Sequence, residues 1–185
     1  MPGIDEILPF HPLNIAVLTV SDTRTIKTDT SGALLAERLI GAGHNLAART
    51  IVTDDVAAIR SQMQAWVSDP AVDIILSTGG TGFTPRDVTP EAVMPLLRRV
   101  MDGFSVVFHQ ASMGTIGVST LQSRAFAGQA EDTFIFCAAR FVAFGNSHTT
   151  ERQRGHLGAA RTIGITELQT NGLRPGRRAH QDSGA

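Results

Sequence analysis

The stretch LSTGGTGFTPRDVTPE, residues Leu76–Glu91, contains the most informative local pattern in the sequence. It begins with apolar residues typical of a strand, passes through three glycines, and reaches Thr-Pro-Glu, which is typical of the first turn of a helix. Glycine lets a chain turn sharply and leaves backbone N–H groups accessible to an anion. The stretch therefore predicts a strand-to-helix junction of an α/β fold, where such folds bind ligands.

Short apolar strands alternate with amphipathic helices on both sides of this junction. The sequence predicts strands over Leu13–Val20, Asn45–Val52, Val72–Thr78 and Asp132–Ala138. It predicts helices over Asp29–Gly43, Asp54–Asp69 and Thr89–Gly103, the last with Thr89 as N-cap. Because buried strands need helical cover on both faces, this order predicts an open, mostly parallel sheet with helices on each side.

The composition indicates a globular protein and excludes several classes of function. The length of 185 residues suits one domain plus a tail, and 42% hydrophobic residues are enough for a core. The net charge of −1 argues against nucleic acid as a partner. Neither a membrane-spanning apolar run nor a secretory signal is evident, which predicts a cytoplasmic protein. Cys137 is the single cysteine, which excludes an internal disulfide, and we expect it in the core.

The residues at the predicted junction have the chemistry of a phosphate-binding loop. The amides of Gly79, Gly80 and Gly82 can approach an anion, and the hydroxyls of Thr78 and Thr81 add donors. The helix that follows adds a partial positive charge at its N-terminus. The spacing matches neither the Walker A loop nor the dinucleotide-binding fingerprint. The alternative is that the glycines only make a tight turn.

Two charged residues, Arg86 and Asp87, follow the glycines and favour a ligand-binding loop. A carboxylate beside an anion repels it unless a cation or a proton lies between them. We therefore expect Asp87 to meet a Mg²⁺ ion that is held mainly by water and substrate. The alternative role of Asp87 is to help cap the next helix.

Further polar residues follow the first two predicted strands, at the same edge of the sheet. Ser21 and Asp22 follow the first strand, whereas Asp54 and Asp55 follow the second. Asp54 is the candidate for a second functional carboxylate, and the alternative is that these acids only cap helices or loops. The six histidines lack the spacing of a metal site, and His109 is the one expected near the loop.

These motifs together resemble the MoaB/Mog proteins of molybdenum cofactor biosynthesis, and the MoaB branch in particular. The resemblance covers the chain from Leu13 to Cys137. It rests on LTVSDTR (Leu18–Arg24), VTDD (Val52–Asp55), LSTGGTGFTPRDVTPEAV (Leu76–Val93), MDGF (Met101–Phe104), a stretch from Ser112 to Gly117, and LQSRAFAG (Leu121–Gly128). It implies a three-layer α/β/α, Rossmann-like fold and assembly as a homotrimer or, as a dimer of trimers, a homohexamer.

The resemblance also implies a ligand, molybdopterin, which is a pterin dithiolene that carries a phosphate. In the adenylyl-transferring members, Mg-ATP adenylylates that phosphate, and the two functional aspartates align with Asp54 and Asp87. Ser21, Asp22, Arg86 and Ser112 become candidates for substrate binding, together with the glycine loop that runs from Thr78 to Gly82.

Three functions remain open on these grounds. The first is an adenylyltransferase that acts on molybdopterin, and the second is a protein that binds or carries molybdopterin without catalysis. The third is a role in nucleotide metabolism like that of CinA-type proteins, which share this domain but normally need additional sequence.

The resemblance ends after the strand at Cys137. The family pattern calls for Leu-Pro-Gly-Ser there, whereas this sequence continues AARFVAFGNSH. Residues 138–142 can be encoded GCT GCC CGG TTC GTN, and reading one base later gives Leu-Pro-Gly-Ser, so we hypothesise a frameshift that resequencing would test. The alternative is a natural divergent tail. We expect an N-terminal arm over residues 1–12, a molybdopterin-binding domain over 13–145, and a poorly ordered tail over 146–185.

Overall fold

Six strands pair into one sheet in the order β2-β1-β3-β6-β5-β4 in the computed structural model, which describes residues 10–139. The strands are β1 (Asn14–Val20), β2 (Asn45–Val52), β3 (Ile74–Thr78), β4 (Arg99–Val100), β5 (Phe126–Ala130) and β6 (Thr133–Ala138). Strands β2, β1, β3 and β6 are parallel, whereas β5 and β4 add antiparallel pairs at one edge. The sheet is therefore mixed, with the predicted parallel strands forming most of it.

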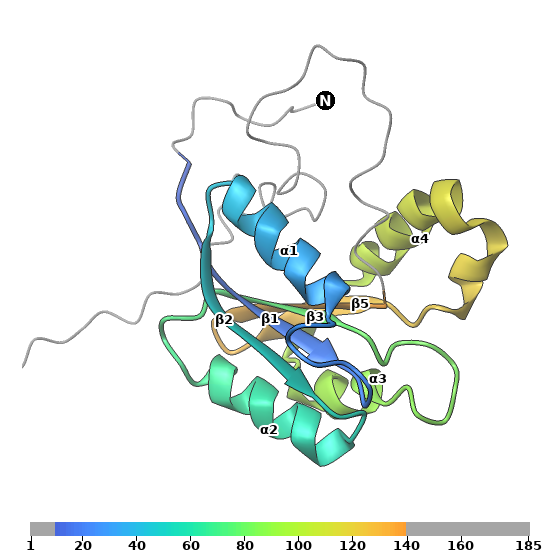
Figure 1. The fold of residues 1–185 in the computed structure, drawn as a ribbon, viewed down its shortest axis with the longest axis horizontal. Coiled ribbons are helices and arrows are strands. Elements are labelled where there is room, and N and C mark those ends of the chain that lie inside the picture. The colour runs from blue at the N-terminus through green and yellow to red at the C-terminus, as the bar shows by residue number, and fades with distance from the viewer. Residues whose placement is uncertain (1–9, 140–185) are drawn as a thin grey trace, which may run out of the picture.

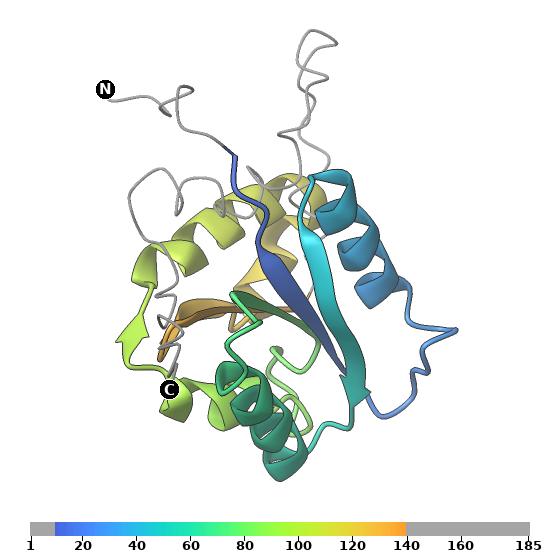
Figure 2. The same cartoon turned by 90° about the vertical axis from the view of Figure 1, so that its left-hand side faces the viewer.

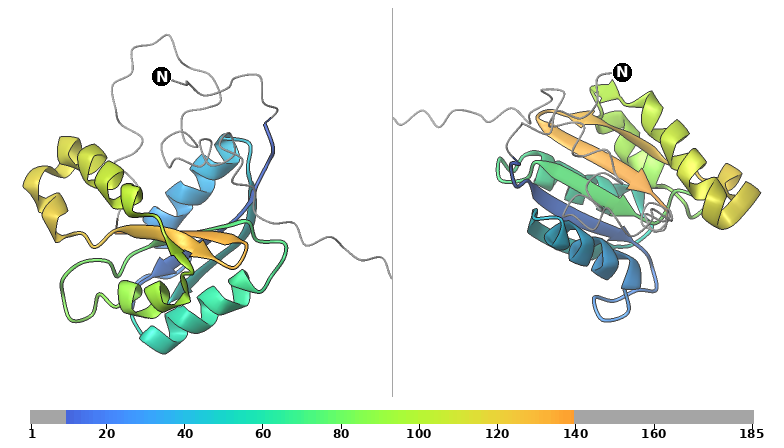
Figure 3. Two further views of the ribbon diagram at one scale, coloured as in Figure 1. Left: turned by 180° about the vertical axis from the view of Figure 1, so that it is seen from behind. Right: turned by 90° about the horizontal axis from the view of Figure 1, so that it is seen from above.

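Helices cover both faces of this sheet, as Figures 1, 2 and 3 show from four sides. Successive strand residues point to opposite faces, so Leu76 and Phe136 pack in one cluster and Ile75 and Ile135 in another. The first cluster includes residues of α1 and α4, and the second includes residues of α2 and α3. The helices are α1 (Thr30–Gly41), α2 (Val56–Val67), α3 (Thr89–Val93) and α4 (Asp102–Ile116), with 3₁₀ turns η1 (Met94–Leu96) and η2 (Gly117–Gln122). The three-layer α/β/α prediction is confirmed.

Carboxylate caps start the first two helices. Asp29 accepts from the amide of Gly32 at the start of α1, and Asp55 accepts from the amide of Ala58 over 2.8 Å at the start of α2. Each cap satisfies an amide that has no partner inside its helix. The capping alternative is therefore confirmed for Asp55.

The helix predicted over Thr89–Gly103 is wrong beyond its first turns. The α-helix α3 ends at Val93, and the chain passes through η1 into the short edge strand β4. Pro95 lies in η1, and proline has no N–H with which to continue an α-helix. Gly103 lies in the first turn of α4 instead of ending a helix. Helix α4 and strand β5 were both absent from the predicted elements.

The strand order creates a topological switch point between β1 and β3. The chain leaves β1 toward β2 on one side of it and later returns to β3 on the other side. The carboxyl ends of β1 and β3, at Val20 and Thr78, therefore lie side by side where α/β sheets bind their ligands. The predicted glycine loop begins at this edge.

Cys137 is fully buried in β6, which confirms the prediction that it is a core residue. Burial raises the pKa of its thiol.

The remaining predictions concern membrane helices and the bounds of the domain and the tail. None of the helices in the described part of the chain combines the length and apolar character needed to cross a membrane. The hypothesised frameshift begins at Ala138, and all of the segment after Ala139, including the tail, lies outside the described residues. The domain bounds 13–145 extend beyond them too and stay a prediction.

Candidate functional site

The turn after β3 requires glycine at two successive positions. Gly79 has a φ angle of +102° and Gly80 one of +63°, both in the left-handed region. A Cβ atom on Gly79 would lie 2.2 Å from the carbonyl oxygen of Val20, and one on Gly80 would lie 2.4 Å from Oγ1 of Thr89. The turn therefore packs its backbone against the end of β1, and a side chain at either position would displace it.

Thr89 sets the direction of the peptide groups in this turn. Its hydroxyl donates to the carbonyl of Gly79 over 3.0 Å, and its backbone N–H donates to the carbonyl of Gly80 over 3.0 Å. Because a trans peptide group points its N–H opposite its C=O, the N–H groups of Gly80 and Thr81 both point away from Thr89. Neither amide donates to another residue between positions 10 and 139. The turn thus leaves two adjacent amides without a described acceptor, one in the half-buried Gly80 and one in the buried Thr81.

The predicted role of Thr89 as N-cap is wrong. Helix α3 begins at Thr89, Val88 precedes it as N-cap, and no side chain caps the helix. The hydroxyl of Thr89 donates to the turn, whereas a capping oxygen accepts from a helical amide. Since α3 has only five residues, the amides of the turn are the main feature that favours an anion.

The carboxylate of Asp87 is built into the loop that follows the turn. Its Oδ2 accepts from the backbone N–H of Thr84 over 2.9 Å and from the hydroxyl of Thr84 over 2.5 Å. Burial pushes the pKa of Asp87 up, but these hydrogen bonds, the Gly82 amide and the charge of Arg124 outweigh it and lower the pKa. Asp87 is therefore ionised and fixes the shape of its loop.

Asp54 lies on the other side of the turn in a contrasting environment. Its Oδ1 lies 3.1 Å from the position that a Cβ on Gly80 would occupy. Burial first, and then the negative charge of Asp87, raise the pKa of Asp54. The structure thus brings both predicted carboxylates close enough to repel each other across the glycine turn. A cation between them would relieve that repulsion.

The two carboxylates differ in how well they fit Mg²⁺. Within the described residues, no group of three or more His, Cys, Asp or Glu side chains is arranged to hold a metal ion. Mg²⁺ often uses one or two carboxylates, with water and substrate phosphates as the remaining ligands. Asp54 fits this pattern, because no described residue hydrogen-bonds to its carboxylate, whereas Oδ2 of Asp87 is engaged by Thr84.

Asp22 connects the loops that follow β1, β2 and β3. Its Oδ1 accepts from the backbone N–H of Asp54 over 3.2 Å, and its Oδ2 pairs with the guanidinium of Arg86. The side chain of Arg86 is 71% exposed. These two predicted substrate-binding residues therefore contact each other, and Asp22 also holds the loop that carries Asp54.

The predicted hydroxyl donors have different environments. Ser21 accepts from two amides of its own loop, and Thr78 donates to the carbonyl of Ala139 over 3.3 Å. Thr81 and Ser112 are buried, and their hydroxyls bond to no described residue. Ser112 lies within helix α4 and does not follow a strand in the sequence. No hydrogen bond among the described residues joins it to the glycine turn.

Arg124 organises the whole loop and was missing from the predicted site. Its backbone N–H donates to the carbonyl of Thr81 over 2.7 Å, and its Nε donates to the carbonyl of Gly82 over 2.7 Å. Its Nη2 donates to the carbonyl of Asp87, and its Nη1 pairs with the carboxylate of Glu91 over 2.5 Å. Arg124 therefore holds both ends of the loop between the turn and α3.

One sequence signal could have identified this arginine. Arg124 is the single charged residue in the stretch from Gly103 to Ala130. A lone charge in such a stretch, directly before a buried strand, requires a polar partner. The predicted site was drawn from the strand ends, the glycine loop and Ser112, and Arg124 was not included although the family motif LQSRAFAG contains it.

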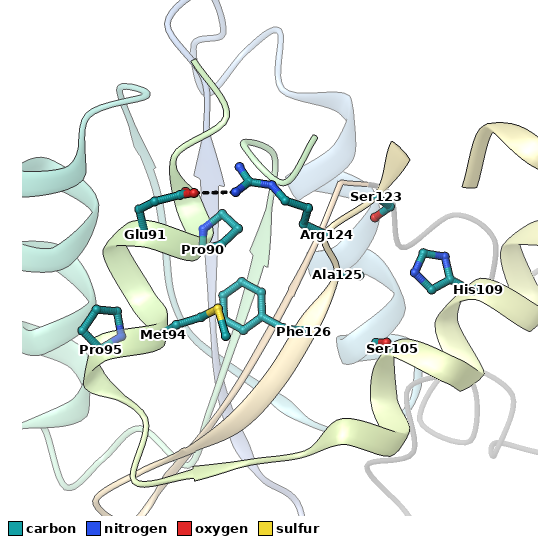
Figure 4. Close-up of a pocket in the computed structure, with 10 residues that line it drawn as sticks. All are labelled: Pro90, Glu91, Met94, Pro95, Ser105, His109, Ser123, Arg124, Ala125 and Phe126. Atoms are coloured by element: carbon teal, nitrogen blue, oxygen red, sulfur yellow. Dashed lines mark hydrogen bonds and ion pairs between the residues drawn. The ribbon is translucent and has the colours of Figure 1, made fainter. Parts of the chain in front are cut away.

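A hollow of about 490 Å³ lies beside Arg124, between α3, η1 and α4 (Figure 4). Phe126 and Met94 form its apolar floor, and Arg124, Glu91 and His109 lie at its rim. His109 lines this hollow and shares a hydrogen bond of 2.9 Å with the hydroxyl of Thr120. Arg124 thus lines this hollow with Glu91 and also donates to the carbonyl of Gly82 in the loop after the turn.

Comparison with known proteins places this architecture in a family. The chain is 47% identical over 127 residues to molybdenum cofactor biosynthesis protein B of Escherichia coli (strain K12). The aligned region covers 69% of this chain and 75% of the relative. Residues 16–140 match the family model MoCF_biosynth, "Probable molybdopterin binding domain". The chain belongs to the MoaB/Mog family. The predicted membership is therefore confirmed.

Solved structures of MoaB/Mog proteins have the same fold. A crystal structure of a molybdenum cofactor biosynthesis protein B superposes with a TM-score of 0.74 at 35% identity and covers 88% of this chain and 96% of its own. The molybdopterin biosynthesis enzyme MoaB from Thermus thermophilus gives a TM-score of 0.65 at 26% identity, with 89% and 99% covered. Membership in the MoaB/Mog family thus agrees with the three-layer fold.

Proposed function

We propose that this MoaB/Mog protein acts in molybdenum cofactor biosynthesis and binds molybdopterin at the turn after β3. The phosphate of the ligand lies against the N–H groups of Gly80 and Thr81. The observation that carries this proposal is the pair of hydrogen bonds from Thr89, which direct both amides to the same side. Two adjacent amides without acceptors at a strand end favour the binding of an anion.

We further propose that the protein transfers an adenylyl group from ATP to the bound phosphate. An oxygen of the molybdopterin phosphate attacks the α-phosphorus of ATP, the bond from that phosphorus to the bridging oxygen breaks, and pyrophosphate leaves. Asp54 would hold a Mg²⁺ ion, which would neutralise charge on the phosphates. Asp87 keeps the loop in the shape that presents the amides.

A second candidate function is binding or delivery of molybdopterin without catalysis. The observation that favours it is the engagement of Oδ2 of Asp87 by Thr84, which leaves Asp54 as the carboxylate without described hydrogen-bond donors. A site with one such carboxylate can bind a phosphate and still lack the charge neutralisation that adenylyl transfer requires.

One titration tests the binding site directly. Inorganic phosphate is added to the ¹⁵N-labelled full chain, and amide chemical shifts are followed by NMR. We expect the Gly80 and Thr81 resonances to move most, while that of Gly114 on α4 stays unchanged because no atom of the turn lies within 4 Å of its Cβ position. Unmoved turn resonances at saturating phosphate would contradict the proposed site.

A second experiment separates the enzyme from the carrier. The protein is incubated with molybdopterin, ATP and Mg²⁺, and both pyrophosphate and retained pterin are measured. Pyrophosphate in proportion to the pterin supports adenylyl transfer. Retained pterin with no pyrophosphate supports the carrier.

We also propose that the protein forms a homotrimer or homohexamer through the face of α4 and η2, and that it works in the cytoplasm. The residues from Gly103 to Gln122 include no charged side chain. Val118 and Leu121 are each 73% exposed, and Val106 and Val107 are each 56% exposed. Stable subunit interfaces bury such apolar surfaces.

The Val107→Glu variant tests this interface. Light scattering should show smaller assemblies than those of the wild type, and equal masses would contradict the proposed interface.

A further inference from the structure

Arg124 contacts three carbonyl groups of one loop through three different nitrogen atoms. Its backbone N–H binds the carbonyl of Thr81, and two guanidinium nitrogens bind the carbonyls of Gly82 and Asp87. The Arg124 residue precedes β5 and lies far along the chain from the loop. A single residue thus fixes peptide groups at both ends of the segment that joins the glycine turn to α3.

These contacts set the direction of amides as well as carbonyls. The carbonyl of Thr81 and the N–H of Gly82 belong to the same planar peptide group and point in opposite directions. Because Arg124 binds that carbonyl, the Gly82 amide points away from Arg124 and interacts with the Asp87 carboxylate, whose pKa it helps to lower. The amide of Gly82 is therefore used inside the loop, which leaves Gly80 and Thr81 for the ligand.

The charge of the guanidinium acts on both neighbouring carboxylates. A hydrogen bond from Arg124 lowers the pKa of Glu91, and the charge of Arg124 contributes to the lowered pKa of Asp87. Glu91 in return holds Nη1, and the ring centre of Phe83 lies 5.6 Å from the guanidinium carbon. The side chain of Arg124 is only 26% exposed, so it is held on several sides.

From these contacts we propose that Arg124 is a positioning residue for the anion-binding turn and for Asp87. Its described contacts reach the ligand through the loop, because each guanidinium nitrogen already donates to the carbonyl of Gly82, the carbonyl of Asp87 or the carboxylate of Glu91. This inference rests on the proposed phosphate site and adds to it the residue that holds the loop in its described shape. Without Arg124, the loop loses its two guanidinium bonds and Asp87 loses the nearby positive charge.

The test uses two variants of the full chain, Arg124→Gln and Arg124→Lys. Arg124→Gln removes the charge and the fork of donors, whereas Arg124→Lys retains a charge that can bind only one group well. The matched control is Arg98→Gln, because Arg98 forms an exposed ion pair of 2.8 Å with Glu131 away from the loop. Folding is checked by thermal unfolding, and each variant is then titrated by NMR.

The first measurement is the titration of the Asp87 carboxyl carbon, which needs no ligand. We expect its pKa to rise in Arg124→Gln, to rise less in Arg124→Lys, and to be unchanged in Arg98→Gln. An unchanged Asp87 titration in a folded Arg124 variant would overturn the proposal. If Arg124→Gln does not fold, the same outcomes are scored on Arg124→Lys.

The second measurement is the dissociation constant for inorganic phosphate. We expect it to increase about tenfold in both Arg124 variants, since a loop displaced by a fraction of an ångström presents its amides poorly. Unaltered affinity in both variants would overturn the positioning role. If the wild type itself binds no phosphate, the proposed site fails, while the Asp87 titration still decides the effect of Arg124 on the loop.

Discussion

The loops after β2 and β3 each bring one aspartate to the glycine turn, and the two residues differ in their surroundings. Asp87 accepts hydrogen bonds from Thr84 and lies near Arg124, so its pKa is lowered. Asp54 has no such donors among the described residues, and its pKa is raised by burial and by Asp87. One carboxylate therefore completes the protein's own structure, and the other is left for a partner from outside.

This difference separates stability from function within a single site. A charged group that is satisfied by the protein contributes to folding, whereas a half-buried group without donors costs folding energy. A cost of this kind is common where a protein binds a ligand or a metal ion. Asp54 in the β2 loop is accordingly the candidate for chemistry, and Asp87 in the β3 loop is the candidate for structure.

Replacement of each aspartate by asparagine is the strongest test of this contrast. We expect Asp54→Asn to lower adenylyl transfer about 1000-fold, because it removes a charge needed at the phosphates, while stability stays equal or increases. Asp87→Asn should lower both turnover and the free energy of unfolding, the latter by about 2 kcal/mol, because it weakens the bonds from Thr84. Turnover by pyrophosphate release and stability by urea unfolding are the measurements.

Glu37→Gln on the exposed side of α1 serves as the control for these two variants. Equal stability losses in Asp54→Asn and Asp87→Asn would contradict the contrast. Full turnover in Asp54→Asn would instead remove the proposed catalytic role.

Displacement of the turn between the two aspartates should have the next largest effect. Gly79→Ala places a Cβ atom 2.2 Å from the carbonyl oxygen of Val20 at a φ angle of +102°. We expect a loss of about 3 kcal/mol in the free energy of unfolding. Gly114→Ala is the matched control, since open space surrounds that position on α4 and alanine favours a helix. A Gly79→Ala variant as stable as the control would contradict the described turn.

The pH dependence of stability should have opposite signs for the two aspartates. Folded Asp54 binds protons more tightly than the unfolded chain, so it lowers stability as pH rises from the ordinary value of 3.8 through its raised pKa. Folded Asp87 binds protons less tightly, so it adds stability as pH rises from its lowered pKa to 3.8. Urea midpoints measured in half-unit pH steps for both asparagine variants should resolve the two slopes. Slopes of the same sign would refute the assignment.

The exposed ion pair between Asp22 and Arg86 should matter least. Arg86→Gln is expected to change the free energy of unfolding by no more than about 0.5 kcal/mol, because water screens an exposed pair. Urea unfolding at low and high salt measures it. A loss above about 2 kcal/mol would show that this pair has a larger role in holding the three loops together.

The sequence allowed prediction of the features that depend on local pattern. The buried strands around Leu18 and Leu76 are continuous apolar runs, and two glycines at the end of such a run are typical of a tight turn. Helix α4 was missed because its sequence after Asp102 has no charged residue and so lacks the charged stripe of an ordinary surface helix. The early end of α3 follows from Pro95, a local signal that outweighs the helical pattern around it.

The geometry of the site depends on contacts between distant parts of the chain. Arg124 binds carbonyls about 40 positions earlier in the sequence, as the Arg124–Gly82 separation of 42 shows. The hydroxyl and the backbone N–H of Thr89 fix the orientation of two peptide groups in the glycine turn. The residues next to Thr89 in the sequence do not indicate this role. Such directions depend on the packing of the folded chain, so no local pattern encodes them.

Because Cys137 is buried, the rate at which its thiol is alkylated reports local opening of this domain. The thiol lies inside β6, which pairs with β3 directly before the glycine turn, and its pKa is raised by burial. A thiolate is the form that alkylating reagents attack, so iodoacetamide should modify only molecules in which the packing around Cys137 has opened. Alkylation rates followed by mass spectrometry would therefore measure rare local openings around β6 in the native protein, without denaturant and without an attached dye.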